Sequence, residues 1–361
     1  MSKKSKKKNN LATISTCIIV KNEKDNLPFL IDDLKKYSEE IIIVDTGSTD
    51  GTLEWLKENQ NDILKLYEFE WIDDFSAARN FSFSKATKDW IFWCDADDRI
   101  SEKLSDKLIV LKNSMNNDIY NTYGTMYKYT PTFTHYRNRL LKRSDNPRWE
   151  CVCHECVTCD DMKIAQLADD CIIIHQHDHG NSSRNAEIFE KHINAGRQLT
   201  RREIFCYAHE INALGRDFEA QQIVLNNIFG QDAWDVLVWE GMMDVMRPLW
   251  TSSIEQANIG IAIIDRYENL NRLRGDVCYL KAVLYDIVQD FDNCFKYCNK
   301  ALEIVMKTPD DYNEDIHFSK ICPAMTLYNY TEDESIKIRM KYIVEQYRDK
   351  SEFATQWLDS L

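Results

Sequence analysis

The first 95 residues alternate between strand-like and helix-like patterns, and this alternation restricts the fold more than any other feature of the chain. Runs of β-branched and apolar residues predict strands at Ile14–Val20, Glu40–Asp45, Ile63–Phe69 and Trp90–Cys94. Helical spacing of apolar residues lies between them, at Leu27–Tyr37, around Leu53–Leu56 and at Phe75–Lys85. Strands that alternate with helices in this way predict a parallel sheet covered by helices on both faces.

The fourth predicted strand ends in the acidic sequence Asp95-Ala96-Asp97-Asp98. In an open α/β sheet, ligands bind at the carboxyl ends of the strands, so these carboxylates would lie at a ligand site. Carboxylate oxygens suit Mg²⁺ or Mn²⁺, and such ions are often bound together with a phosphate group. The alternative is an acidic turn that caps the next helix, since Asp also favours turns and helix N-termini.

Three further polar motifs follow the other predicted elements. They are Val20-Lys21-Asn22-Glu23, the loop from Asp45 to Thr52, and Phe75-Ser76-Ala77-Ala78-Arg79-Asn80. A carboxylate at Asp45 could accept hydrogen bonds from a ribose hydroxyl or a base N–H, whereas Asp45 and Asp50 could equally be turn and cap residues. The four motifs together, at the ends of successive elements, indicate a single binding edge.

This order of motifs resembles the nucleotide-sugar-dependent glycosyltransferases of family 2, which have the GT-A fold. The resemblance rests on a strand into Lys-Asn-Glu, then Val-Asp-x-Gly-Ser-x-Asp-Gly-Thr, Phe-Ser-x-Ala-Arg-Asn, and a Trp-containing strand into Asp-x-Asp-Asp. It is close over residues 14 to about 100 and looser to about 185. It implies a GT-A (Rossmann-like, mostly parallel sheet) α/β catalytic domain.

The resemblance also implies roles for individual residues. Asp45 would bind the nucleoside of a UDP-sugar, Arg79 would lie near the uracil and ribose, and Asp97 would ligate a divalent ion, Mg²⁺ or Mn²⁺. That ion would offset the negative charge that grows on the diphosphate leaving group. The implied donor-binding set is Val20, Asn22, Glu23, Asp45, Arg79, Asp95, Ala96 and Asp97.

A cysteine-rich segment, residues 148–159, follows a predicted β region at 121–143. Enzymes of this kind carry a similar His-Glu segment, which makes Glu155 the candidate base for an inverting transfer, with His154 as the alternative or its orienting partner. A purely structural His154–Glu155 pair is the other reading. Cys151, Cys153, Cys156 and Cys159 could form a zinc site, but a single compressed run favours free thiols.

The last predicted strand of this region, Asp170–His175, leads into His175-Gln176-His177. In similar enzymes a histidine after this strand completes the metal site or contacts the diphosphate. His175 is the first candidate and His177 the second, because both would share a face if the strand continued. A histidine-rich surface turn is the alternative. Arg184 and Asn185 follow and are expected near the diphosphate.

The remainder of the chain, from about Ala186, has an almost purely helical pattern. Two windows, starting at Phe205 and at Cys278, share apolar positions at an offset that fits two units of a helix-pair repeat of about 34 residues. We therefore expect a tail at 1–12, a GT-A domain at 13–185, and an all-α tetratricopeptide-like domain at 186–361 that binds the acceptor or forms a homodimer. An irregular helical bundle is the alternative.

Composition restricts the partners and the compartment. The net charge of −14 argues against nucleic acid as a ligand, and no apolar run approaches the length of a membrane span. Twelve cysteines without an export signal predict a reducing, cytoplasmic location. The lysine-rich residues 1–10 predict a disordered tail.

The expected function is transfer of a hexose, by default glucose, from a UDP-sugar to Cys or Ser side chains of a peptide. The subgroup with a helical-repeat tail includes peptide S- and O-glycosyltransferases of the sublancin type, which modify bacteriocin precursors, and enzymes of surface polysaccharide assembly, whose acceptors are saccharides. A non-catalytic sugar-nucleotide and peptide-binding module is a third reading. A nucleotidyltransferase is rejected, because Lys21–Asp25 contains no glycine for a phosphate loop.

Overall fold

The computed structural model describes residues 11–129, 134–176, 183–229, 236–268, 274–307 and 317–361. The chain divides into two compact units, Met1–Gln198 and Leu199–Leu361. Helix α5 (Arg184–Asn194) belongs to the first unit, although the sequence placed the start of the helical region near Ala186. The lysine-rich residues 1–10, for which a disordered tail was predicted, lie outside the described residues.

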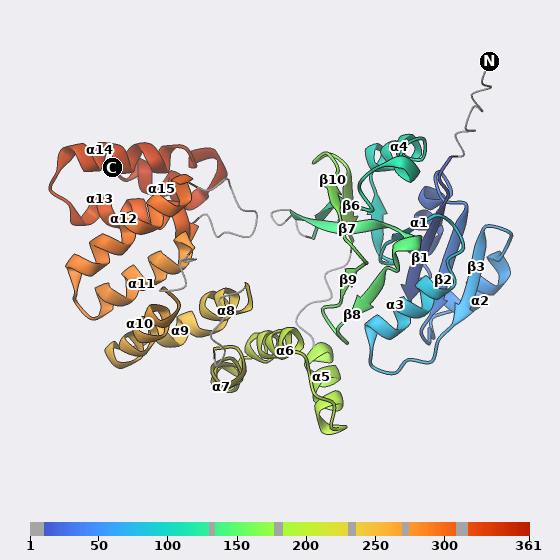
Figure 1. Ribbon diagram of the computed structural model, residues 1–361, viewed down its shortest axis with the longest axis horizontal. Coiled ribbons are helices and arrows are strands. Elements are labelled where there is room, and N and C mark those ends of the chain that lie inside the picture. Colours follow the sequence, from blue (N-terminus) through green and yellow to red (C-terminus); the bar gives the residue numbers. More distant parts are fainter. Residues whose placement is uncertain (1–10, 130–133, 177–182, 230–235, 269–273, 308–316) are drawn as a thin grey trace, which may run out of the picture. The chain divides into compact units, whose positions relative to one another are not determined.

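The first unit is built around one mixed sheet (Figure 1). Along the sheet the strands follow the order β3-β2-β1-β4-β7-β6-β11-β5, and β10 pairs with β6. The strands are β1 (Ile14–Val20), β2 (Glu40–Asp45), β3 (Leu64–Glu68), β4 (Trp90–Trp93), β5 (Asp98–Ile100), β6 (Thr122–Lys128), β7 (Thr134–Lys142), β10 (Ile164–Gln166) and β11 (Ile172–His175). A separate hairpin pairs β8 (Arg148–Glu150) with β9 (Cys156–Thr158).

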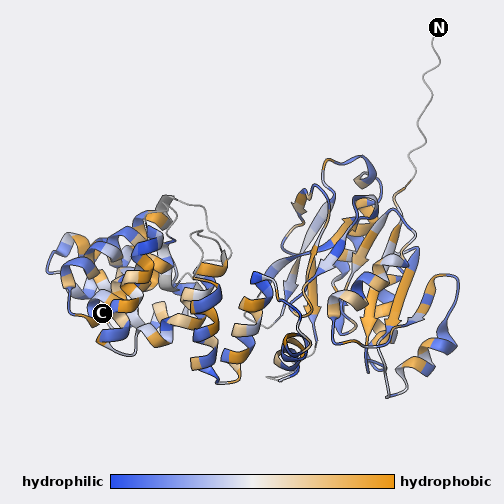
Figure 2. Ribbon diagram, turned by 60° about the horizontal axis from the view of Figure 1, so that its bottom comes forward, coloured by the Kyte–Doolittle hydropathy of each residue, from blue (hydrophilic) through white to orange (hydrophobic). Residues whose placement is uncertain are grey.

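The four strands β3, β2, β1 and β4 are parallel, as the strand–helix alternation predicted. Nearly all residues of β1, β2 and β4 are buried, as expected for parallel strands covered on both faces. Figure 2 shows hydrophobic residues along the strands of this sheet. Four helices connect the strands of this unit: α1 (Leu27–Leu34), α2 (Thr52–Asn59), α3 (Phe75–Ser84) and α4 (Glu102–Leu111). The later strands add the antiparallel pairs β4–β7 and β6–β7, which makes the sheet mixed.

The second unit is helical in the part of the chain that the structure describes. Its α-helices are α6 (Arg201–Ala213), α7 (Asp217–Asn227), α8 (Val236–Glu240), α9 (Arg247–Trp250), α10 (Ile254–Glu268), α11 (Gly275–Ile287), α12 (Phe291–Lys307), α13 (Cys322–Tyr330), α14 (Glu334–Glu345) and α15 (Glu352–Asp359). The pairs α6/α7 and α11/α12 each have a three-residue connection, residues 214–216 and 288–290. An α/β domain followed by an all-α region is therefore confirmed.

The helical unit contains a buried charged cluster beside its apolar core. The Lys281 side chain is fully buried, and its Nζ lies 2.5 Å from Asp265 Oδ1, 2.5 Å from Glu268 Oε2 and 2.6 Å from the Tyr297 hydroxyl. Because two carboxylates neutralise the ammonium, this cluster fastens α10 to α11 and α12. Among the described residues, no helix has both the length and the apolar character needed to cross a membrane.

Candidate active site

The site lies where the order of the parallel strands reverses. Strands β1 and β4 are neighbours, and the chain extends from them in opposite directions across the sheet, which is where open α/β sheets bind ligands. A hollow of about 320 Å³ opens at their carboxyl ends. Its lining includes the predicted residues Val20, Glu23, Arg79, Asp95, Ala96, Asp97, His154, Glu155 and His175.

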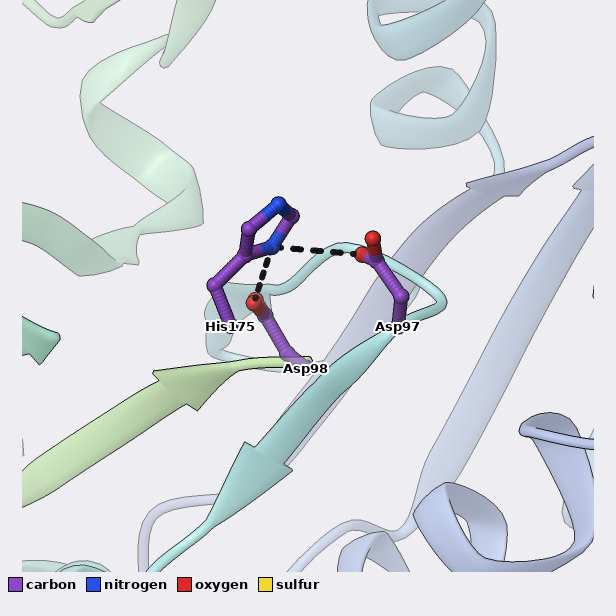
Figure 3. Close-up of side chains that lie close together, drawn as sticks. All are labelled: Asp97, Asp98 and His175. Carbon is purple, nitrogen blue, oxygen red and sulfur yellow. Dashed lines mark ion pairs between the residues drawn. The ribbon is translucent and has the colours of Figure 1, made fainter. Parts of the chain in front are cut away.

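Two lining residues, Asp97 and His175, form with the buried Asp98 a grouping that could hold a metal ion (Figure 3). Their candidate ligand atoms all lie within 4.8 Å of one another. His175 Nδ1 is 3.6 Å from Asp97 Oδ1 and 3.7 Å from Asp98 Oδ1. The pairing of β11 with β5 explains the grouping, because it places His175 directly opposite Asp98.

The electrostatics of this grouping fit a divalent cation. Burial, reinforced by the Asp95 and Asp98 carboxylates and opposed by His175, raises the pKa of Asp97 to about 6. Burial disfavours a charged imidazolium, yet the nearby Asp98 and Asp97 carboxylates raise the pKa of His175 above its usual value. Two buried carboxylates and an imidazole form a mixed oxygen–nitrogen donor set that suits Mn²⁺ and accepts Mg²⁺ less readily.

His177, the second predicted histidine ligand, lies outside the described residues. Asp98 is part of the acidic motif but was not predicted as a metal ligand. Its position beside His175 follows only from the pairing of β5 with β11. Within the described residues, none of the four clustered cysteines joins a metal-binding grouping. Cys153 instead lines the hollow, and its Sγ lies 3.4 Å from the Asn185 side-chain oxygen.

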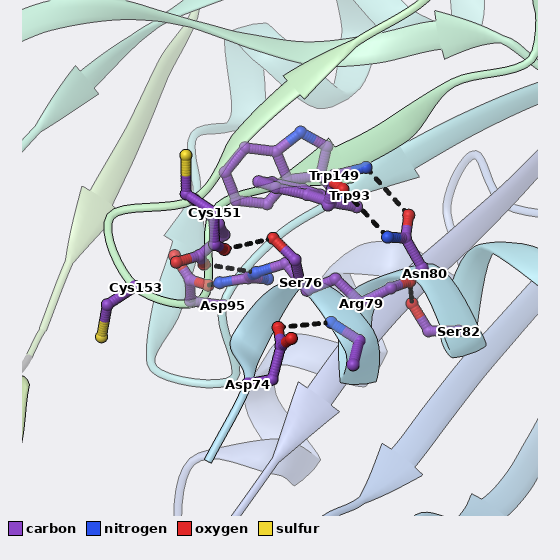
Figure 4. Close-up of polar contacts among 12 residues, drawn as sticks. Asp74, Ser76, Arg79, Asn80, Ser82, Trp93, Asp95, Trp149, Cys151 and Cys153 are labelled. Atoms are coloured by element: carbon purple, nitrogen blue, oxygen red, sulfur yellow. Dashed lines mark hydrogen bonds and ion pairs between the residues drawn. The ribbon is translucent and has the colours of Figure 1, made fainter. Parts of the chain in front are cut away.

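Arg79 lies between two carboxylates of the hollow (Figure 4). Its Nη2 donates to Asp95 Oδ1 and its Nε to Glu155 Oε1, both at 2.7 Å. The guanidinium also lies over the rings of Trp93 and Trp149, at 5.0 and 4.8 Å from their centroids. Arg79 thus lines the hollow as expected, but its N–H groups hold Glu155 and Asp95 in place.

Helix α3 also fixes the loop that carries Glu155. The Asn80 side chain exchanges two hydrogen bonds with the backbone of Trp149, at 2.8 and 2.9 Å. Ser76 Oγ donates to the Cys151 carbonyl (Figure 4). The Phe75 backbone N–H donates to the Val152 carbonyl. The Phe-Ser-x-Ala-Arg-Asn motif therefore positions the β8–β9 loop as well as lining the hollow.

The β8–β9 loop itself has an uncommon backbone. Cys151 and His154 have φ angles of +77° and +51°, in the left-handed region that non-glycine residues rarely adopt. Such conformations persist where surrounding contacts enforce them, and they concentrate at functional sites. Here the contacts from α3 enforce them, and the loop presents Cys153, His154 and Glu155 to the hollow.

Only some of the residues predicted to bind the nucleoside line the hollow. Val20 and Glu23 line the hollow together with Thr46, whereas the buried Asp45 and the exposed Asn22 are not among its lining residues. Asp45 Oδ1 accepts hydrogen bonds from the Gly47 and Ser48 N–H groups, at 2.9 and 3.0 Å. Its Oδ2 is buried and has no hydrogen-bond partner among the described residues, which leaves one acceptor available for a ligand.

Asn22 supports the loop that follows β2. Its backbone N–H donates to Ser48 Oγ at 2.9 Å, and its side-chain oxygen accepts from the Thr49 N–H at 2.7 Å. Asn22 has a φ of +60°, which Asn tolerates better than most residues. These contacts join the loops after β1 and β2 into one wall beside the hollow.

Two arginines of β7 contribute to the site and were not predicted. Arg139 is fully buried, and its Nη1 lies 3.3 Å from Asp98 Oδ2 and 3.8 Å from Asp95 Oδ2. Arg137 lines the hollow. Both guanidiniums lie against the rings of Trp93 and Tyr127, and the β6–β7 register shifts beside Arg139.

These observations define an α/β domain with a buried metal-binding grouping and a candidate base at one switch-point hollow, the organisation of a nucleotide-sugar enzyme of the GT-A class. Residues 15–176 match the family model described as Glycosyl transferase family 2. This segment of the chain therefore belongs to glycosyl transferase family 2.

Curated relatives match over shorter stretches. A TPR repeat-containing protein of Synechococcus elongatus is 41% identical over 90 residues, covering 25% of this chain and 22% of that protein. The prophage-derived glycosyltransferase SunS of Bacillus subtilis is 37% identical over 101 residues, covering 28% of this chain and 24% of SunS. Each match thus spans less than a quarter of the relative's own length.

A solved structure of S. aureus TarS, in complex with UDP-GlcNAc, aligns at a TM-score of 0.41 with 13% identity. The alignment covers 85% of this chain and 95% of the TarS chain. The family assignment depends on the sequence match and not on this superposition.

Proposed function

We propose that this chain is a metal-dependent glycosyltransferase that moves a hexose from a UDP-sugar to a peptide side chain with inversion at the sugar carbon. The observation that carries the proposal is the convergence of two unlike groups on one hollow. Asp97 and His175 of the metal-binding grouping line the hollow, and Glu155, held by Arg79, lines it too. The domain's membership in glycosyl transferase family 2 supports the reaction class.

In the proposed reaction the acceptor O–H or S–H transfers its proton to the Glu155 carboxylate. The acceptor atom forms a bond to the anomeric carbon as the bond from that carbon to the diphosphate oxygen breaks. The electron pair of the broken bond leaves with the nucleoside diphosphate. A bound divalent cation would stabilise the negative charge on this leaving group, and Asp97, with His175 and Asp98 beside it, would hold the cation.

Arg79 has a positioning role in this scheme. It holds the Glu155 carboxylate on one side and the Asp95 carboxylate on the other, so the candidate base and the acidic motif keep a fixed separation. The two flanking indole rings restrict the guanidinium further. Asp45, with its available Oδ2, would accept a hydrogen bond from the nucleoside.

The acceptor part of the proposal depends on the second unit and on the resemblance to sublancin-type enzymes. Helix-pair arrays offer surfaces on which peptides dock, so a Cys- or Ser-containing bacteriocin precursor is the proposed acceptor. The same unit could instead join two copies of the chain. A saccharide acceptor in surface polysaccharide assembly is the alternative, favoured by the size of that subgroup.

The test is incubation of the purified protein with a panel of UDP-sugars and Mn²⁺, with and without a Cys/Ser-containing peptide encoded beside its gene. The expected result is a hexose-sized mass gain on the intact peptide that disappears when EDTA is added. Metal-dependent release of UDP without a peptide product would move the acceptor to a saccharide. If neither a peptide product nor UDP release is detected with any UDP-sugar of the panel, the glycosyltransferase proposal is refuted.

A further inference from the structure

Arg137 is a half-buried cation of the hollow that the proposed reaction has not used. Its guanidinium lies 5.7 Å from the ring centroid of Trp93 and 5.3 Å from that of Tyr127. Within the part of the chain that the structure describes, no ion pair or hydrogen bond joins the Arg137 side chain to another residue. An arginine withdrawn from water without a counter-ion is unfavourable.

The neighbouring charges make this position more unfavourable. Arg139 and Arg79 lie nearby, and each is already neutralised by carboxylates: Arg139 by Asp98, and Arg79 by Asp95 and Glu155. Burial, and after it the Arg139 charge, lowers the pKa of Arg137, and the Asp95 carboxylate, which already accepts a hydrogen bond from Arg79, opposes this shift only in part. The local balance of charge at Arg137 therefore favours an anion that comes from outside the protein.

The other cations that line the hollow do not need a bound anion to offset burial. Lys21 and Arg184 also line the hollow, but both side chains are exposed, so water solvates their charge. An exposed charge needs no partner. Among these cations, Arg137 is therefore the one whose burial favours binding of an anionic ligand.

The location of Arg137 identifies which anion it can reach. Tyr127 contacts Arg137 on one side, and its ring centroid lies 6.0 Å from that of His175. His175 in turn stacks on Tyr129, at 5.1 Å with an interplanar angle of 9°. Arg137 and His175 therefore both neighbour the Tyr127 ring, and both line the same hollow together with Asp97.

We propose that Arg137 binds the diphosphate of the sugar nucleotide, as a second positive group beside the metal-binding grouping. This inference rests on the proposed function, since the diphosphate is that of the proposed donor. A guanidinium can donate two parallel hydrogen bonds to phosphate oxygens, which suits an anion that must be held in one orientation. When the bond to the sugar breaks, the electron pair stays on a diphosphate oxygen, and Arg137 stabilises that charge.

The experiment is calorimetric titration of the full-length protein with uridine, UMP and UDP, each in Mn²⁺ and in EDTA. Wild type is compared with Arg137→Gln, with Arg137→Lys, and with Arg143→Gln as the matched control. Arg143 follows β7 directly and donates to the Lys88 carbonyl, outside the hollow. A parallel titration with GDP and ADP covers the case of a different nucleoside.

We expect Arg137→Gln to weaken UDP binding about ten- to hundredfold, both with and without metal, at about 1.4 kcal/mol per tenfold change. Uridine affinity should stay within about twofold of wild type, since hydrogen bonds to a charged group are the ones removed. Arg137→Lys should recover part of the loss, because it restores the charge without the two-pronged geometry. Arg143→Gln should bind UDP as wild type does.

Two results would overturn the inference while leaving the proposed function intact. One is a UDP affinity unchanged in Arg137→Gln, and the other is an equal loss of uridine and UDP binding, which would assign Arg137 a structural role. If Arg137→Gln does not fold, the Arg137→Lys comparison of UDP with uridine decides. Wild type that binds no nucleoside diphosphate more tightly than its nucleoside would instead refute the proposed function.

Discussion

Asp97→Asn should make the metal-free protein more stable while removing its stabilisation by metal. Burial and the neighbouring carboxylates raise the pKa of Asp97 from 3.8 to about 6, so ionisation is disfavoured in the folded state. A pKa that is higher by about 2 in the folded state lowers the free energy of unfolding by about 3 kcal/mol at pH values well above 6, because one pKa unit corresponds to 1.36 kcal/mol. Asn keeps the shape of the side chain without its charge.

The sign of the effect follows from proton linkage. The folded state holds the Asp97 proton more tightly than the unfolded state, so this group's contribution to wild-type stability falls between about pH 4 and pH 6. His175 loses one of its two carboxylate neighbours in the variant, which offsets part of the gain. We therefore expect Asp97→Asn to be about 1–2 kcal/mol more stable than wild type at pH 8 in EDTA, and about equal at pH 4.

The assay is urea unfolding of the α/β unit at pH 4 and pH 8, followed by tryptophan fluorescence. In Mn²⁺ at about 100 times its Kd, wild type should gain about 2.7 kcal/mol and the variant nothing, which reverses the order of stability. Asp98→Asn is the matched control. Its carboxylate pairs with the buried Arg139 and belongs to the metal-binding grouping, so this variant should lose about 3–5 kcal/mol in EDTA and also gain less from Mn²⁺ than wild type. An Asp97→Asn protein less stable than wild type at pH 8 in EDTA would refute the reasoning.

Three further outcomes are expected. Glu155→Gln should lower kcat at least about a hundredfold with the Kd for the sugar nucleotide unchanged, and a loss of less than about tenfold would exclude Glu155 as the base. Arg79→Ala should destabilise the protein by about 3–5 kcal/mol in chemical unfolding because it leaves two carboxylates unpaired, whereas Arg79→Lys should retain one ion pair and lose less than Arg79→Ala. Mn²⁺ affinity, followed by electron paramagnetic resonance, should fall about tenfold per pH unit below about 6, as protons compete for Asp97, and pH-independent affinity would contradict its role as a ligand.

The parallel half of the sheet could be predicted from the sequence almost to the residue. The observed strands β1 and β2 have the predicted bounds, Ile14–Val20 and Glu40–Asp45. In both, a segment rich in β-branched residues ends at a polar turn, so burial and turn chemistry indicate the same boundary. The acidic motif after β4 was recognisable for the same reason.

The partners of the site residues could not be predicted in this way. Arg79 was recognised within its motif, but Glu155, which it binds, lies 76 positions later in the sequence. Asp98 and His175 are brought together only by the pairing of β5 with β11. Local patterns report what a residue is suited for, whereas strand order and loop closure decide which residues it meets.

Arg137 and Arg139 are site residues that the sequence did not predict, for a different reason. Both stand in a predicted β segment rich in tyrosine, and strict alternation along that strand gives no reason for two arginines to approach the acidic motif. The pairing of β7 with β4 and β6 brings this strand to Trp93 and Tyr127, and both guanidiniums lie against those rings. The sequence feature that could have indicated them is a pair of arginines separated by one residue in a half-buried strand, because buried charges need partners.

Asp95 and Asp97 show how this fold gives two carboxylates of one motif different tasks. Burial alone would raise the pKa of Asp95, but the Arg79 and Arg139 guanidiniums hold it well below its usual range. Asp97, two residues later, faces His175 instead of an arginine, and its pKa is raised to about 6. Asp95 is therefore a permanent anion committed to the internal ion-pair network, whereas Asp97 is a carboxylate whose charge is stabilised best by an added cation. Environments that separate two neighbouring pKa values in this way are how a protein assigns roles within one site, and here they support the proposal that Asp97 binds the cation.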